Sequence, residues 1–174
     1  MSSQPFIHLF RFIILISLQV LLARNLVLFN TAFCYVYIAF LLLLPIQMPK
    51  VTLLVLAFLT GFTVDIFYDT LGINAAACVL LTYLRPYVLL LLTPRDDYEK
   101  SDTVNLHVMG WQWFSVYSLF LIFVHHLALF FLELGSFQAL GFTLVKIIGS
   151  TVYTFLVLVI LQLLFFSSRR TNRL

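Results

Sequence analysis

Long apolar stretches follow one another along almost the whole chain, separated by short gaps that are polar or contain proline. A helix needs roughly 20 apolar residues to cross the hydrocarbon core of a bilayer, and the chain has room for about six such stretches. With 63% apolar and 10% charged residues, it carries more apolar surface than a soluble domain of its size can bury. The sequence therefore predicts an all-α integral membrane protein.

We expect one membrane domain over residues 1–174, folded as a bundle of six transmembrane helices. Pro45 and Pro49 bracket the turn after the second helix, which is short, and a charged stretch follows the fourth. The predicted helices cover residues 6–28, 33–47, 51–68, 73–92, 111–134 and 139–166, with a cytoplasmic linker over residues 94–110.

Basic residues near the ends of the predicted helices indicate the orientation of the bundle. If the N- and C-termini are both cytoplasmic, only Arg24 lies on the outer side. Trp111 and Trp113 then lie at the cytoplasmic interface, where indole rings are enriched. The basic residues placed on the cytoplasmic side are Arg11, Lys50, Arg95, Lys100, Arg169, Arg170 and Arg173.

The third predicted helix carries small and acidic residues at intervals of four. Ala57, Gly61, Asp65 and Asp69 therefore share one face of this helix. The small residues allow a neighbouring helix to approach closely, so this face is a candidate contact surface for a partner. Asp65 has two readings, either a packing device held by a buried hydrogen bond or ion pair, or a contact for a ligand or partner.

Several ionisable residues lie at a similar depth in the outer half of the predicted bundle. An ionisable group inside the membrane is costly and calls for a partner or a function. From depth alone, we expect Asp65 to pair with Lys146 or with one of the adjacent histidines His125 and His126. Above this layer the sequence places Arg24, Asp69 and Glu133.

Arg85 lies past the middle of the fourth predicted helix and precedes Pro86. Proline has no N–H to donate, which leaves the carbonyl of Thr82 without its helical donor. We expect a kink in which the freed carbonyls and the guanidinium stabilise one another. A functional charge is the alternative.

The sequence shows no set of metal ligands or catalytic groups. Adjacent residues on a helix point about 100° apart, so His125 and His126 cannot easily bind one ion together. Cys34 and Cys78 lie within apolar runs, as small buried hydrophobic residues do. We therefore expect no cofactor, no metal and no enzymatic activity.

Three short motifs resemble a known family. They are Gly61-x-x-x-Asp65 followed by Leu71-Gly72, then Leu84-Arg85-Pro86-Tyr87 and Thr93-Pro94-Arg95-Asp96. Together with the chain length, the six-helix layout and the basic tail, they resemble the MreD family of rod shape-determining proteins. The resemblance covers nearly the whole chain.

The resemblance implies a multi-pass protein of the bacterial inner membrane that belongs to the cell-elongation machinery. The family partners are the bitopic scaffold protein MreC, the actin-like MreB filament indirectly, and a peptidoglycan glycosyltransferase and transpeptidase pair. The family has no established catalytic residues to carry over. Its fold is similar to that of the substrate-binding S-components of energy-coupling-factor vitamin transporters.

Two functions follow from this resemblance, and they differ in what the bundle must contain. A vitamin-binding S-component needs a cavity of roughly 300 Å³ or more with convergent polar groups. A scaffold for MreC needs only a groove for another protein's helix. Because the polar residues are few and can pair with one another, the sequence favours the non-enzymatic scaffold.

Overall fold

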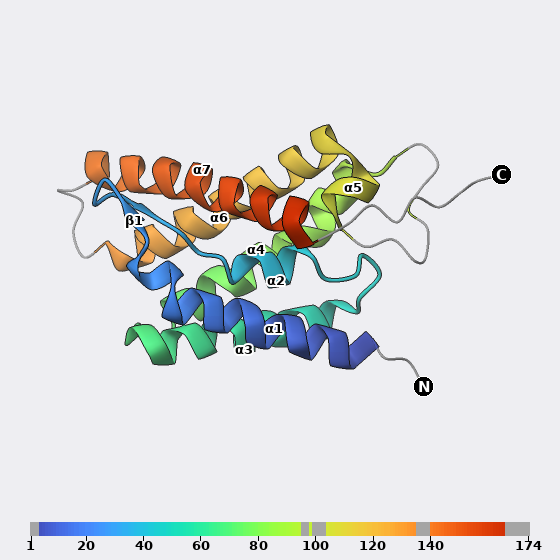
Figure 1. The fold of residues 1–174 in the computed structure, drawn as a ribbon, viewed down its shortest axis with the longest axis horizontal. Helices are drawn as coiled ribbons and strands as arrows, with labels where there is room; N and C mark the ends of the chain where they lie inside the picture. Colours follow the sequence, from blue (N-terminus) through green and yellow to red (C-terminus); the bar gives the residue numbers. More distant parts are fainter. Residues whose placement is uncertain (1–3, 95–97, 99–103, 135–139, 166–174) are drawn as a thin grey trace.

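The computed structural model describes residues 4–94, 98, 104–134 and 140–165, with side chains from residue 9 onward except that of residue 24. This part of the chain is mostly helical, and its longer helices run along the long axis of the molecule (Figure 1). The charged part of the predicted linker and the basic tail lie outside the described residues.

Four helices are long and apolar enough to cross a membrane. They are α3 (Lys50–Tyr68), α4 (Ile73–Leu91), α6 (Trp111–Glu133) and α7 (Leu140–Phe165), and they coincide closely with four of the predicted ranges. Each of them leaves many large apolar side chains exposed, as a helix facing lipid does. The chain is therefore a mainly helical, multi-pass membrane protein.

The first predicted helix ends earlier than expected. Helix α1 covers Gln4–Leu21, and a 3-10 turn η1 follows over Ala23–Asn25. The chain then reverses in a small antiparallel hairpin of β1 (Val27–Leu28) and β2 (Ala32–Phe33). Asn30 lies in the hairpin turn with a positive φ, a conformation that asparagine tolerates better than most residues.

The prediction of a continuous helix over residues 33–47 is wrong. Only Ile38–Leu42 is α-helical there, as α2; Phe33 belongs to β2, residues 34–35 are irregular and residues 36–37 form a turn. The segment is apolar enough for a helix, but side chains of the neighbouring helices supply hydrogen bonds to its backbone. An α-helix is therefore not required to satisfy these groups.

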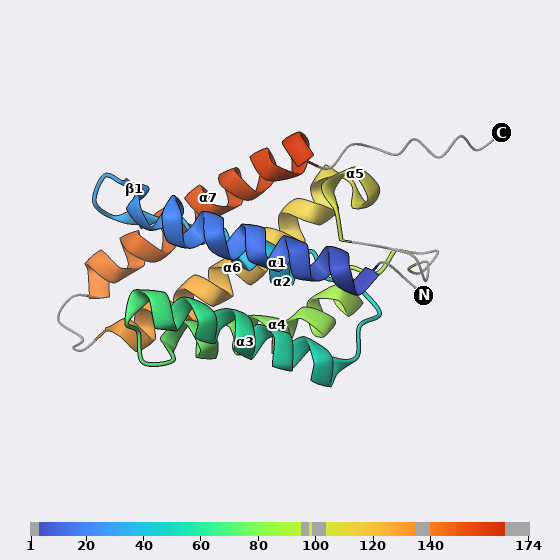
Figure 2. The same cartoon turned by 60° about the horizontal axis from the view of Figure 1, so that its bottom comes forward.

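Two ends of the bundle can be distinguished. Figure 2 shows α1 beginning and α7 ending at one end, where α3 also begins, while the β1–β2 hairpin lies at the other, here called the hairpin end. Helix α5 (Leu106–Met109) lies within the predicted linker range and packs against α6. Helix α2 lies inside the bundle and contacts α1, α3, α4 and α6.

Candidate functional site

The residues from 34 to 44, here called the central segment, are all buried inside the bundle. Because most of this segment is not helical, its N–H and C=O groups need partners from elsewhere. Non-helical backbone is tolerated at membrane depth only where it is buried in protein or lines a water-filled cavity. The partners of the central segment therefore decide what the polar side chains of the bundle do.

Helix α7 binds the start of the central segment, and Phe33 just before it, through polar side chains. Phe33 N–H donates to Ser150 Oγ at 2.9 Å, and Tyr35 N–H donates to Thr154 Oγ1 at 3.2 Å. Ser150 and Thr154 are one helical turn apart on α7 and lie beside the extended chain.

Gln19 on α1 binds the same stretch from the opposite side. Its Nε2 donates to Cys34 O at 3.1 Å and to the hydroxyl of Tyr68 at 2.7 Å, and its Oε1 accepts from Tyr37 N–H at 3.4 Å. One side-chain amide thus replaces two of the backbone partners that an α-helix would have supplied.

Arg85 binds the other end of the central segment. Its guanidinium donates to Leu44 O, to Pro45 O at 3.4 Å and, through Nε, to the hydroxyl of Tyr117 at 2.8 Å. Tyr117 in turn donates to Leu42 O at 3.0 Å. Free carbonyls do stabilise the guanidinium, but they belong to Leu44 and Pro45, which follow α2 (Ile38–Leu42), and not to Thr82.

The two histidines of α6 bind different partners. His125 Nε2 lies 2.9 Å from the hydroxyl of Tyr37, which itself donates to Asn74 Oδ1 at 2.9 Å. The hydroxyl proton is thereby used, so His125 donates through Nε2–H. His126 Nδ1 lies 2.7 Å from Ile122 O, an acceptor, and must carry its proton.

Asp65 is buried, and its carboxylate caps the start of α4, the helix that follows it. Its Oδ1 accepts from the backbone and side-chain N–H groups of Asn74 at 3.0 and 3.1 Å and from Thr70 Oγ1 at 2.5 Å. Its Oδ2 accepts from Ala75 N–H at 2.9 Å. Asp65 therefore satisfies free N–H groups at the start of α4, as an N-cap residue does.

The predicted pairing of Asp65 with Lys146 or an α6 histidine is wrong as a direct contact. The chain returns so tightly after α3 that the start of α4 reaches the carboxylate first. His125 is nevertheless linked to Asp65 through Tyr37 and Asn74.

Lys146 binds Glu133 instead. Its Nζ lies 3.6 Å from Glu133 Oε2 and about 5 Å from the ring centroids of Phe33 and Phe130, at 5.1 and 4.8 Å. This ion pair joins α6 to α7 near the β1–β2 hairpin. Asp69 lies at the same end, exposed and with a positive φ.

The small-residue face of α3 is covered by α4 of the same chain. Ala57 is fully buried, and a Cβ added at Gly61 would lie 2.6 Å from both Asn74 O and Ala75 N. This close approach explains the glycine, because any side chain there would push the two helices apart. The expectation that Ala57 and Gly61 form a surface for another protein is therefore wrong.

Sequence reasoning missed the uncharged members of this network. Glutamine, asparagine, serine and threonine are tolerated in apolar helices. Because they carry no charge, a search for ionisable groups in the membrane does not single them out. The spacing of Ser150 and Thr154 by one turn was the available signal. The missed residues are Gln19, Tyr37, Asn74, Tyr117, Ser150 and Thr154.

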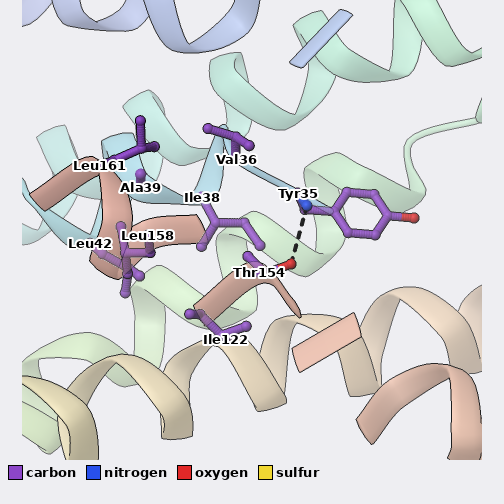
Figure 3. Close-up of a pocket in the computed structure, with 9 residues that line it drawn as sticks. All are labelled: Tyr35, Val36, Ile38, Ala39, Leu42, Ile122, Thr154, Leu158 and Leu161. Carbon is purple, nitrogen blue, oxygen red and sulfur yellow. Dashed lines mark hydrogen bonds between the residues drawn. The ribbon is translucent and has the colours of Figure 1, made fainter. Parts of the chain in front are cut away.

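One hollow inside the described part of the bundle is very small. The hollow between the central segment, α6 and α7 has a volume of only about 10 Å³, and its lining is apolar apart from the Tyr35–Thr154 hydrogen bond (Figure 3). That is about the space for one water molecule. Within the described ranges, no three histidine, cysteine or acidic side chains come together as metal ligands.

A larger hollow lies on the outside of the bundle between α3 and α4. This open groove has a volume of about 770 Å³ and runs toward the hairpin end, where Asp69 lies beside it. Its walls are mostly apolar, and the rings of Phe58 and Phe62 stack there with centroids 5.7 Å apart. The lining residues are Phe58, Phe62, Asp65, Ile66, Asp69, Thr70, Leu71, Gly72, Ala75, Ala76 and Val79.

Comparisons with protein-family models, with curated proteins and with solved structures found no match to this chain. The fold and the site therefore define its class by geometry alone. It is a multi-pass, mainly helical membrane protein. Its buried polar side chains form hydrogen bonds with the backbone in and around the central segment, which is only partly helical.

Proposed function

We propose that this chain is a non-enzymatic membrane scaffold of the bacterial cell-elongation complex, in the manner of the MreD family that its sequence resembles. Its partner in the membrane would be a bitopic protein of the MreC kind, which links it to the peptidoglycan glycosyltransferase and transpeptidase pair and indirectly to MreB. The membrane in question would be the bacterial inner membrane.

The observation that carries this proposal is how the buried polar groups are used. Gln19, Arg85 and Thr154 bind the chain's own backbone, and Asp65 caps its own α4. A substrate-binding S-component needs such groups to converge on a cavity of several hundred Å³. The hollow between the central segment, α6 and α7, about 10 Å³, is too small for a vitamin, and this supports the scaffold over the transporter component.

The groove between α3 and α4 is the surface best suited to a partner helix. It is open and mostly apolar, with exposed aromatic rings that can pack against a helix. The exposed Asp69 carboxylate beside it favours a partner that carries a basic residue near the same membrane surface.

The proposed topology has six crossings, with the central segment as the second and both termini in the cytoplasm. It follows from the alternating direction of the passes and from the predicted cytoplasmic position of Lys50 and Arg11. The cysteine of Asp69→Cys is then expected to react with an impermeant maleimide in intact cells, and that of Lys50→Cys only after permeabilisation. The reverse labelling pattern would invert the topology.

The experiment for the partner uses photo-crosslinking in the native membrane. A benzophenone side chain replaces Phe62 in the groove or, as the matched control, Phe142 on α7, since these phenylalanines are 46% and 54% exposed. We expect an adduct with an MreC-type protein from position 62 only. Reversing the charge with Asp69→Lys should weaken this adduct.

Two results would contradict the scaffold proposal. Equal adducts from positions 62 and 142 would mean that the groove does not select a partner. Co-purification of an ATP-hydrolysing module, or of a bound vitamin, would make this chain the substrate-binding subunit of a transporter.

A further inference from the structure

A second cleft lies between α3 and α4, at the end of the bundle where α3 begins. It has a volume of about 110 Å³, several times the roughly 10–15 Å³ that a cavity needs to hold one water molecule. None of the residues that line it line the partner groove described above. Lys50 contributes a charge to this cleft, and Thr82, Tyr83 and Tyr87 contribute hydroxyl groups.

The cleft is positively charged because it contains the Lys50 side chain and because it lies at the N-terminus of α3. Lys50 is the first residue of α3, and its Nζ lies 5.9 Å from the centroid of the Tyr87 ring. The first turn of a helix has free N–H groups and a partial positive charge, both of which favour anions. Among the carboxylates that the structure describes, none forms an ion pair with Lys50.

Thr82 supplies an independent sign that the cleft is built for a ligand. This residue is 1% exposed, and its Oγ1 has no hydrogen-bond partner within the described part of the chain. A buried hydroxyl without a partner costs free energy unless something else binds it.

We propose that this cleft binds the phosphate head group of an anionic phospholipid. Lys50 pairs with the phosphate oxygens, the Thr82 hydroxyl hydrogen-bonds to the head group, and the tyrosine hydroxyls complete the polar rim. The acyl chains lie along the exposed apolar flanks of α3 and α4 deeper in the bundle, which include Val55 and Leu80. Lysine and tyrosine at a helix end are typical of the membrane interface, where lipid phosphates lie.

The flanking apolar surface is what favours a lipid over free phosphate. An inorganic anion would use Lys50 and Thr82 but leave the flanks of the two helices without a role. This site is independent of the scaffold proposal, because no partner protein is needed to fill it. Loss of lipid binding can therefore be measured without loss of binding to a partner protein, and the reverse.

The test uses the full-length protein, delipidated in mild detergent, and titrates it with short-chain phosphatidylglycerol while its thermal unfolding and lipid binding are followed. We expect phosphatidylglycerol to bind and to raise the unfolding midpoint, and phosphatidylcholine to do so much less. Lys50→Met should weaken phosphatidylglycerol binding about fivefold, the effect of one basic residue near the surface. Lys146→Met, at the hairpin end, removes the same charge and should leave binding unchanged.

Thr82→Val separates binding from folding. Because the hydroxyl has no partner within the described protein, its loss should not lower the unfolding midpoint without lipid, yet it should weaken lipid binding about threefold to tenfold. Thr60→Val is the matched control, since Thr60 donates only to Leu56 O of its own helix. Unchanged binding in both Lys50→Met and Thr82→Val would overturn the site. Inorganic phosphate reproducing the shift would overturn the lipid and leave a free-phosphate site.

Discussion

Ala75 N–H, in the first turn of α4, donates to the carboxylate of Asp65 on α3 at 2.9 Å. The helix cap of α4 is therefore a side chain of the preceding helix and not of its own N-cap residue, Gly72, which has no side chain to offer. This contact closes the hairpin of α3 and α4 at the hairpin end, and both oxygens of the Asp65 carboxylate accept hydrogen bonds from the α3–α4 turn and the start of α4.

Asp65→Asn is expected to destabilise the protein by about 1–3 kcal/mol. An asparagine amide has one oxygen and one NH₂ group where aspartate has two oxygens. The NH₂ group would therefore face a donor from Ala75, Asn74 or Thr70. Unfolding of the variant in detergent measures the loss. Asp69→Asn is the control, because Asp69 is exposed and asparagine tolerates its positive φ. Equal effects of the two substitutions would refute the capping role.

Gly61→Ala is expected to cost about 1–3 kcal/mol or more, because α3 and α4 must separate to admit the methyl group. The same substitution at Gly141 on α7 meets no atom within 4 Å and should be neutral or stabilising, since alanine favours helices. Thermal unfolding of both variants gives the comparison. A tolerated Gly61→Ala would show that the two helices lie farther apart than described.

Arg85 and Tyr117 are expected to be coupled in a double-mutant cycle. Each binds carbonyls at or just after the end of α2, and each binds the other at 2.8 Å, so the effects of Arg85→Gln and Tyr117→Phe should not add. The expected coupling energy is about 0.5–3 kcal/mol. Additive effects on the free energy of unfolding would mean that the Nε–hydroxyl bond contributes nothing.

Thr154→Val is expected to destabilise the protein by about 1–3 kcal/mol, because Tyr35 N–H and His126 Nε2 both lose their partner. Thr151→Val on the same helix is the matched control, since its hydroxyl donates only to Ile147 O one turn earlier. Hydrogen exchange at Tyr35 provides a local readout and should accelerate in Thr154→Val alone. Unchanged exchange there would argue against the Tyr35–Thr154 bond.

Hydropathy determined much of the fold. A stretch such as residues 51–68 is too long and apolar for water, and lipid leaves its backbone no partner outside the helix, so α3 follows directly. The same reasoning fails for residues 33–47. It assumes that lipid surrounds the segment. Instead, the segment lies inside the bundle, where the side chains of Gln19, Ser150 and Thr154 form hydrogen bonds with its backbone.

The sequence by itself determined which four long apolar stretches form helices able to cross a membrane, and that Asp65, Arg85, His125 and His126, which lie within them, need partners. Only the tertiary structure decided what those partners are. Depth along a helix restricts where a polar group lies, but its hydrogen bond depends on which backbone groups of other segments remain unpaired nearby. That is why Asp65 binds the start of α4 rather than Lys146, and why Arg85 binds carbonyls just after α2 rather than the carbonyl of Thr82.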